Sequence, residues 1–145
     1  MRRAIGSIRD LPNVWMDTSM VMDPLVLQIA LEAIGPGRLV FGTDFCVAAM
    51  RGRRVRVMDH WVDVVLPGRP QSAFRVQSDN MRATFMAVEI AVAVRDAAER
   101  VGLSEADRHA IFFENGMALL DRVMGGRQRK AVEDRWNPPA DRGEA

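Results

Sequence analysis

Hydrophobic and polar positions in the first third of the chain predict two strands separated by a helix. Residues 14–19 are rich in β-branched and aromatic types over a short stretch, which is typical of a strand. Asp23 and Pro24 are the residue types preferred at the N-cap and the first helical position, and Gly35 ends the predicted helix. Residues 39–41, Leu-Val-Phe, form a continuous apolar run, as in a strand buried on both faces. This order predicts a βαβ unit with a parallel sheet.

The pattern on either side of this unit is less regular. Residues 4–9 have the character of the last turns of a helix that ends before Pro12, because proline denies the preceding residue helical geometry. Residues 46–78 combine a basic cluster with little periodicity, and we expect a loop excursion over one end of the sheet. Residues 125–145 are polar and unpatterned, which predicts a disordered tail after a folded part at 1–124.

The second half of the chain is predicted to be helical. Residues 81–101 form a long helix that Gly102 ends, and its candidate caps are Ser78, Asp79 and Asn80. Ser104 and Asp107 have the spacing of a capping box that begins a shorter helix. Residues 115–124 form the last helix, which a pair of glycines ends.

Composition narrows the classes of function. A chain of 145 residues suffices for one domain but not for two. No apolar run reaches the ~18–20 residues of a membrane span, and no signal peptide is evident, so we expect a cytoplasmic protein without a membrane partner. The single cysteine, Cys46, excludes an intramolecular disulfide and a multi-cysteine zinc module. A net charge of +1 gives no general attraction to nucleic acid.

Asp44 is the candidate catalytic residue. It follows the buried second strand directly, where parallel α/β folds build their active sites. Gly42 would permit close backbone approach, and Thr43 could orient the carboxylate through a hydrogen bond. The alternative is that Asp44 only caps the next helix or turn, and its position alone favours neither interpretation.

Three segments resemble the last part of an amidohydrolase-related (amidohydrolase 2 type) metal-dependent hydrolase. Residues 13–19 correspond to that family's seventh strand, and residues 35–45 to an eighth strand that ends in Gly-Ser/Thr-Asp. Residues 111–120 correspond to a terminal helix introduced by an Asn-Ala-x-x-Leu-like pattern, in which Gly116 here replaces the alanine. The resemblance implies an α/β fold: the C-terminal portion of a (β/α)8 TIM barrel, with about two parallel strands plus several helices, incomplete on its own.

The resemblance also implies a role for Asp44. In that family this aspartate binds the catalytic divalent metal, zinc above all, and accepts a proton from the metal-bound water. The water attacks an amide or ester carbonyl of a small-molecule substrate, and related members decarboxylate or hydrate theirs. Asp44 is therefore our candidate both as catalytic base and as metal ligand.

The family's metal-binding histidines have no counterpart here. They lie on its first, fifth and sixth strands, whereas this sequence has only two histidines. We expect His109 to be an ordinary helix residue and His60 to be at most a substrate contact. A whole barrel needs about 250 residues, so we expect this chain to be part of a longer hydrolase, inactive and metal-free when isolated.

Two residues near the candidate site have open roles. Cys46 could line a pocket, although a buried, inert thiol is the commoner outcome. Asp17 ends the first strand at the same edge of the sheet, where it either lines a pocket or forms a turn.

Two non-enzymatic interpretations remain. Residues 51–56 contain four arginines, and with Trp61 they could bind a polyanion, although a solvated loop or contacts to an anionic substrate explain them more simply. Alternatively, the chain is a non-catalytic remnant that forms a homo-oligomer through apolar residues of the long helix, such as Phe85 and Val88.

Overall fold

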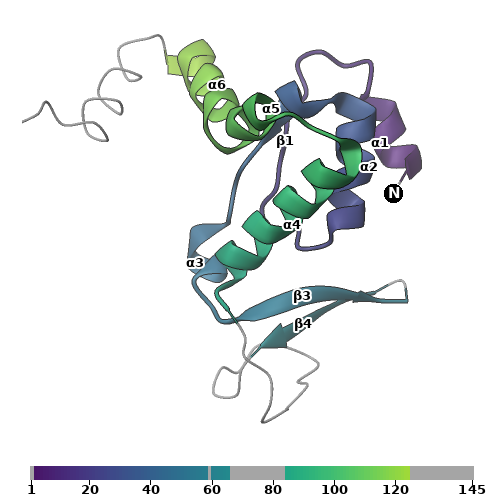
Figure 1. Ribbon diagram of the computed structural model, residues 1–145, viewed down its shortest axis with the longest axis vertical. Coiled ribbons are helices and arrows are strands. Elements are labelled where there is room, and N and C mark those ends of the chain that lie inside the picture. The colour runs from purple at the N-terminus through teal and green to yellow at the C-terminus, as the bar shows by residue number, and fades with distance from the viewer. Residues whose placement is uncertain (1, 59, 66–83, 125–145) are drawn as a thin grey trace, which may run out of the picture.

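The computed structural model describes residues 2–58, 60–65 and 84–124, with the side chains of 2–4 and 65 left out. The elements are α1 (Arg2–Ile8), β1 (Met16–Asp17), α2 (Pro24–Ile34), β2 (Leu39–Val40), α3 (Phe45–Ala48), β3 (Gly52–Val57), β4 (His60–Val65), α4 (Met86–Val101), α5 (Glu105–His109) and α6 (Asn115–Met124) (Figure 1). A 3-10 turn at Pro36–Arg38 precedes β2, and a π-helix at Ala110–Glu114 joins α5 to α6. No helix in this described part is long and apolar enough to cross a membrane.

The predicted βαβ unit is confirmed. β1 and β2 pair in parallel, with Met16 opposite Leu39 and Asp17 opposite Val40, and α2 connects them. Asp23 caps α2, because its Oδ1 accepts a hydrogen bond of 2.9 Å from the backbone N–H of Leu25. Both strands are shorter than the apolar runs that predict them.

The excursion predicted at residues 46–78 contains regular structure, so its interpretation as a loop is wrong for residues 46–48, which lie in α3, and for the strands at 52–57 and 60–65. β3 and β4 form an antiparallel hairpin in which Gly52 pairs with Val65 and Val57 with His60. Valines on both strands favour extended backbone. Arg54 and Asp63 face each other across the hairpin and form an ion pair. The charged residues among the valines hide the period-two alternation on which the prediction depends.

α4 begins at Met86, five residues later than predicted. The chain before it continues the hairpin: the N–H of Gly52 donates to the carbonyl of Thr84 at 3.0 Å, and that of Met86 donates to Met50 at 2.9 Å. These tertiary hydrogen bonds keep Thr84 and Phe85 out of the helix. The candidate caps Ser78, Asp79 and Asn80 lie outside the described residues.

The predicted helices at the end of the folded part are confirmed and joined. Ser104 and Asp107 form the capping box of α5, since each side chain accepts the other's backbone N–H. The π-helix makes α5 and α6 one continuous helical segment. The predicted tail at 125–145 lies outside the described residues.

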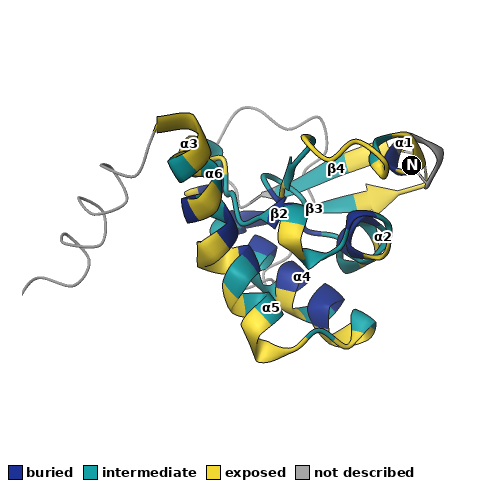
Figure 2. Cartoon of the chain, turned by 90° about the horizontal axis from the view of Figure 1, so that it is seen from above, coloured by how far each residue is buried: buried dark blue, intermediate teal, exposed yellow. Residues whose placement is uncertain are grey.

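Two long helices form the centre of the molecule. α2 and α4 pack against each other, and Figure 2 shows buried residues on both. The core cluster draws on these helices, β2 and the π-helix, and includes Leu27, Leu31, Leu39, Ile90, Val94 and Ile111. Burial of these apolar side chains supplies the main stabilising free energy of the fold.

Arg38 attaches α1 to this centre. Its guanidinium donates to the carbonyls of Arg9 and Leu11, each at 2.7 Å, and to that of Ile34 at 3.3 Å. One side chain thus donates to carbonyls that follow α1 and to the carbonyl at the end of α2, and so ties the two helices together.

β2 is held on the side away from β1 by the terminal helical segment. The N–H of Phe41 donates to the carbonyl of Ile111 at 2.9 Å. The buried Asn115 donates through Nδ2 to the carbonyls of Leu39 at 2.7 Å and Pro36 at 2.8 Å. In the described part of the chain, the β1–β2 sheet therefore has a helical segment along one edge, where a barrel would have another strand. This sheet does not close into a barrel.

Replacing Asn115 should destabilise the fold strongly. Asn115→Ala removes both donors and leaves the Leu39 carbonyl without this hydrogen bond, so the free energy of unfolding should fall by about 2–3 kcal/mol. The neighbouring Gly116→Ala is the matched control: a Cβ there lies 3.6 Å from Val40 Cγ1, an ordinary contact. The control should be neutral or raise stability by up to about 1 kcal/mol. Urea unfolding followed by circular dichroism measures both, and equal stability of the two variants would contradict this role of Asn115.

Candidate functional site

The loops that follow β1 and β2 are joined at the carboxyl end of the sheet by Thr18. Its buried hydroxyl donates to the carbonyl of Gly42 at 2.9 Å and accepts the N–H of Gly42 at 3.0 Å. Its own backbone N–H donates to Val40 at 3.1 Å. The local sequence pattern does not single out Thr18, because its partner is 24 residues away.

Glycine is required at position 42 because the loop after β1 approaches the backbone closely there, as predicted. A Cβ built on it would lie 2.8 Å from Ser19 Oγ and 3.3 Å from Asp17 Cβ. The two loops therefore pack with almost no space between them at this point. Asp44 follows two residues later, so the packing of Gly42 against the loop after β1 also fixes the position of the Asp44 backbone.

Asp44 occupies the N-cap position of α3, but its side chain does not act as the cap. Its backbone has a left-handed conformation (φ 57°), and its carbonyl accepts the N–H groups of Val47 at 2.9 Å and Ala48 at 3.0 Å. The residue is exposed, and the described residues show no hydrogen bond from Thr43 to its carboxylate, contrary to the orienting role predicted for Thr43. The carboxylate of Asp44 is thus available to an external partner.

Asp17 forms a turn. Its Oδ1 accepts the backbone N–H of Ser19 at 2.7 Å, and the residue is exposed at the same edge of the sheet as Asp44. Of the two roles left open for Asp17, this hydrogen bond supports turn formation.

Cys46 is exposed, so the expectation of a buried thiol is wrong. It lies in α3, a helix of four residues in which Ala48 is the one buried residue. The short α3 buries too little of its surface to cover the thiol.

The histidines lie on separate elements. His60 begins β4 and is exposed, and His109 ends α5 with its ring 5.8 Å from that of Phe113. Within the part of the chain that the structure describes, no three His, Cys, Asp or Glu side chains form a group that could hold a metal ion. Asp44 can supply one ligand, and these residues alone do not fit a complete metal centre.

The arginines of residues 51–56 all interact within the chain. Arg54 binds Asp63 through Nε at 2.7 Å and Nη2 at 3.0 Å, and Arg53 Nη1 lies 3.6 Å from Glu89 Oε2. The guanidinium of Arg51 lies 4.8 Å from the ring centre of Phe85, and Arg56 donates to the carbonyl of Met58 at 2.9 Å. The cluster thus has a structural role in fastening the hairpin to itself and to α4.

The electrostatics connect this hairpin with Asp44. The pKa of Arg54 is raised by its hydrogen bond to Asp63, opposed by partial burial, and raised further by the charges of Asp63 and Asp44. Asp44 is therefore close enough to Arg54 for their charges to interact.

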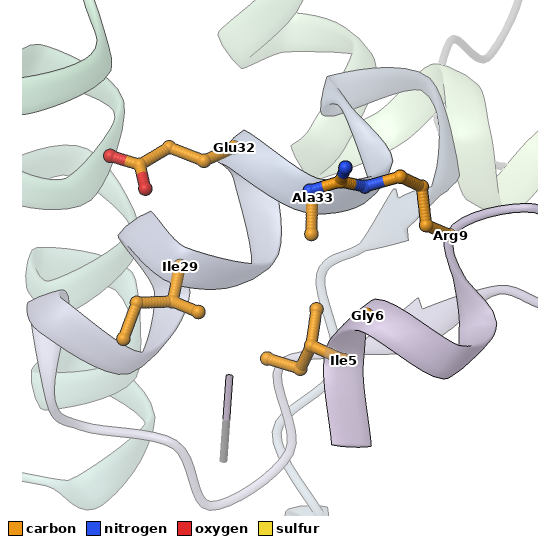
Figure 3. Close-up of a pocket in the computed structure, with 6 residues that line it drawn as sticks. All are labelled: Ile5, Gly6, Arg9, Ile29, Glu32 and Ala33. Atoms are coloured by element: carbon orange, nitrogen blue, oxygen red, sulfur yellow. The ribbon is translucent and has the colours of Figure 1, made fainter. Parts of the chain in front are cut away.

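Hollows between secondary-structure elements lie among the described residues. One, of about 90 Å³, lies between α1 and α2, where Ile5 and Ile29 face each other beside Arg9 (Figure 3). The part of α2 that lines it leads toward the amino end of β2, away from Asp44. Another, of about 260 Å³, lies between the start of α2 and β3.

The sequence matches a known protein family. The family model described as amidohydrolase matches residues 1–122, which is most of the sequence. Comparison with curated proteins and comparison with solved structures found no match.

Filling the contact at Gly42 should destabilise the carboxyl end of the sheet. Gly42→Ala places a methyl group against Ser19 and Asp17, and the two hydrogen bonds to Thr18 prevent the backbone from moving away. We expect a loss of about 1–3 kcal/mol in the free energy of unfolding. Gly37→Ala is the control, because a Cβ there meets nothing within 4 Å. A Gly42→Ala protein as stable in urea as the Gly37→Ala protein would show that the loops can separate freely.

Proposed function

This chain belongs to the amidohydrolase family, whose members are of the metal-dependent hydrolase type, and we propose that it provides the catalytic carboxylate, Asp44, of such an enzyme. The reaction is hydrolysis of an amide or ester bond of a small molecule, or a related decarboxylation. In this proposal the chain is the C-terminal part of a (β/α)8 barrel, and histidines on strands outside it complete the metal centre.

The observation that carries the proposal is the availability of the Asp44 carboxylate. It lies just beyond β2, at the edge of a parallel sheet where this architecture builds active sites. Capping of α3 is done by the Asp44 backbone, so the carboxylate is not used in holding the fold together. An ionised carboxylate in this position can coordinate a divalent cation or accept a proton.

The cation we propose is divalent, with zinc as the first candidate. Family membership supports a divalent metal, and the described residues contribute Asp44 as one oxygen ligand. A catalytic zinc site usually has three protein ligands, so the remaining ligands must come from outside these residues. This chain alone should therefore be inactive.

Asp44→Asn tests the proposal in a protein that joins this chain to the histidine-bearing strands of its barrel. Asparagine keeps the shape of the side chain but removes its charge and basicity, so kcat/KM should fall by about 10²- to 10⁴-fold. The matched control is Asp17→Asn, because asparagine can still accept the Ser19 N–H and close the turn.

The control should retain turnover within about threefold of the unmodified enzyme, since exposed substitutions away from the reacting atoms have small effects. Near-normal turnover by the Asp44→Asn enzyme would refute the role of Asp44. An equal loss in the Asp17→Asn enzyme would show that negative charge at this edge matters, rather than Asp44 itself.

A further inference from the structure

The groove of about 260 Å³ between α2 and β3 combines apolar and cationic walls. Its volume is close to the lower end of small-molecule sites, which begin at about 300 Å³. Met22, Pro24 and Val55 supply apolar surface. The charged lining residues are Asp23 and the three arginines Arg53, Arg54 and Arg56. A groove of this composition suits a small organic molecule that carries an anionic group.

The one carboxylate in the lining is already engaged. Asp23 Oδ1 accepts the N–H of Leu25 at 2.9 Å and caps α2, where the positive end of the helix dipole stabilises its charge. The guanidinium groups of the lining therefore outnumber its carboxylates, and the one carboxylate of the lining is held by the helix.

The acidic partners of the arginines lie outside the lining of the groove and hold the guanidiniums in place. Arg54 uses Nε and Nη2 for Asp63, so its Nη1 takes no part in that pair. Arg53 Nη1 is 3.6 Å from Glu89 Oε2, beyond the roughly 2.7–3.2 Å of an ordinary hydrogen bond. Arg53 Nη2 also lies 3.5 Å from the carbonyl oxygen of Met22, so both of these contacts of Arg53 are long. A ligand carboxylate at ordinary hydrogen-bond distance would compete favourably with them for Arg53, next to an Arg54 that Asp63 keeps oriented.

The groove lies on the functional side of the sheet. Residues 18–23 lead from the carboxyl end of β1 into α2, and the last of them lines the groove. The pKa of Arg54 is raised mainly by its hydrogen bond to Asp63, and the charge of Asp44 adds the smallest contribution. A molecule in the groove would therefore lie at the same end of the sheet as Asp44.

We propose that this groove binds the carboxylate of a small organic acid, with Arg53 as the principal contact and the β3–β4 hairpin as the element that presents it. The inference deepens the proposed function, on which it rests for the idea that the bound acid is a substrate. It assigns to the hairpin the recognition of an anionic substrate group, separate from the chemistry at Asp44.

The test is a titration of the isotopically labelled 145-residue chain with benzoate, followed by nuclear magnetic resonance at constant ionic strength. Benzamide is the neutral control of the same shape. Benzoate should shift the backbone amide signals of Leu25 and Val55 in a saturable manner, and benzamide should bind at least about tenfold more weakly, because it lacks the charge that the arginines recognise.

Arg53→Gln should weaken benzoate binding by about tenfold or more. Its matched control is Arg95→Gln, because Arg95 is an exposed arginine on α4 paired with Asp96 and lies outside the lining of the groove. The control should leave the dissociation constant unchanged.

Several results would overturn the proposal. These are equal affinity for benzoate and benzamide, no shift at Leu25 or Val55, unchanged affinity in Arg53→Gln, or equal loss in Arg95→Gln. The benzoate and benzamide comparison uses the unmodified chain, so it decides even if Arg53→Gln does not fold. Benzoate binding requires neither metal nor turnover, so the two proposals can fail separately. If benzoate does not bind in the groove but Asp44→Asn greatly lowers kcat/KM, only the groove proposal is wrong. If benzoate binds as expected but Asp44→Asn leaves kcat/KM nearly unchanged, only the role of Asp44 is wrong.

Discussion

The structure depends on the hydrogen bonding of one very short strand from both of its sides. β2 pairs with β1 on one side, and on the other the helical segment from Ala110 onward accepts from Phe41 and donates from Asn115. An apolar strand with unpaired backbone groups would be costly to bury, and two parallel strands alone leave such groups on both edges. The terminal helices therefore do for β2 what a neighbouring strand does in a larger sheet, and the π-helix places the Ile111 carbonyl within reach of Phe41.

This constraint positions the candidate site. Because β2 is fixed, Gly42 is held against the loop after β1 by the two hydrogen bonds of Thr18. Asp44 then follows at the edge of the sheet with its carboxylate exposed and its backbone capping α3. The hairpin covers the same end of the molecule and brings Arg54 near enough to Asp44 for their charges to interact. Rigid backbone and an uncommitted carboxylate are the combination that a catalytic residue requires.

Local signals in the sequence were sufficient for the βαβ unit, the Asp23 cap of α2, the capping box at Ser104 and the candidacy of Asp44. Each rests on residues a few positions apart, whose chemistry acts within one element. The hairpin, the late start of α4, the exposure of Cys46 and the roles of Thr18, Arg38 and Asn115 could not be predicted in this way. The start of α4 and the roles of Thr18, Arg38 and Asn115 depend on partners far along the chain, such as the carbonyl 76 residues earlier that accepts from Asn115 Nδ2. The hairpin is hidden by charged residues that interrupt the alternation of its valines, and Cys46 is exposed because the short α3 buries little of its surface. The role of Asp44 in a metal centre and the closure of a barrel are still predictions.

In the proposed enzyme, the fold holds the carboxylate of Asp44 ready for a divalent cation. The most direct measurement is the zinc affinity of the protein that joins this chain to the histidine-bearing strands, with Asp44 intact and as Asp44→Asn. Loss of a ligand from a centre that otherwise remains whole should weaken zinc binding by more than about tenfold. The same measurement on Asp17→Asn should give the unmodified affinity. Equal zinc affinity with and without the Asp44 carboxylate would contradict the account.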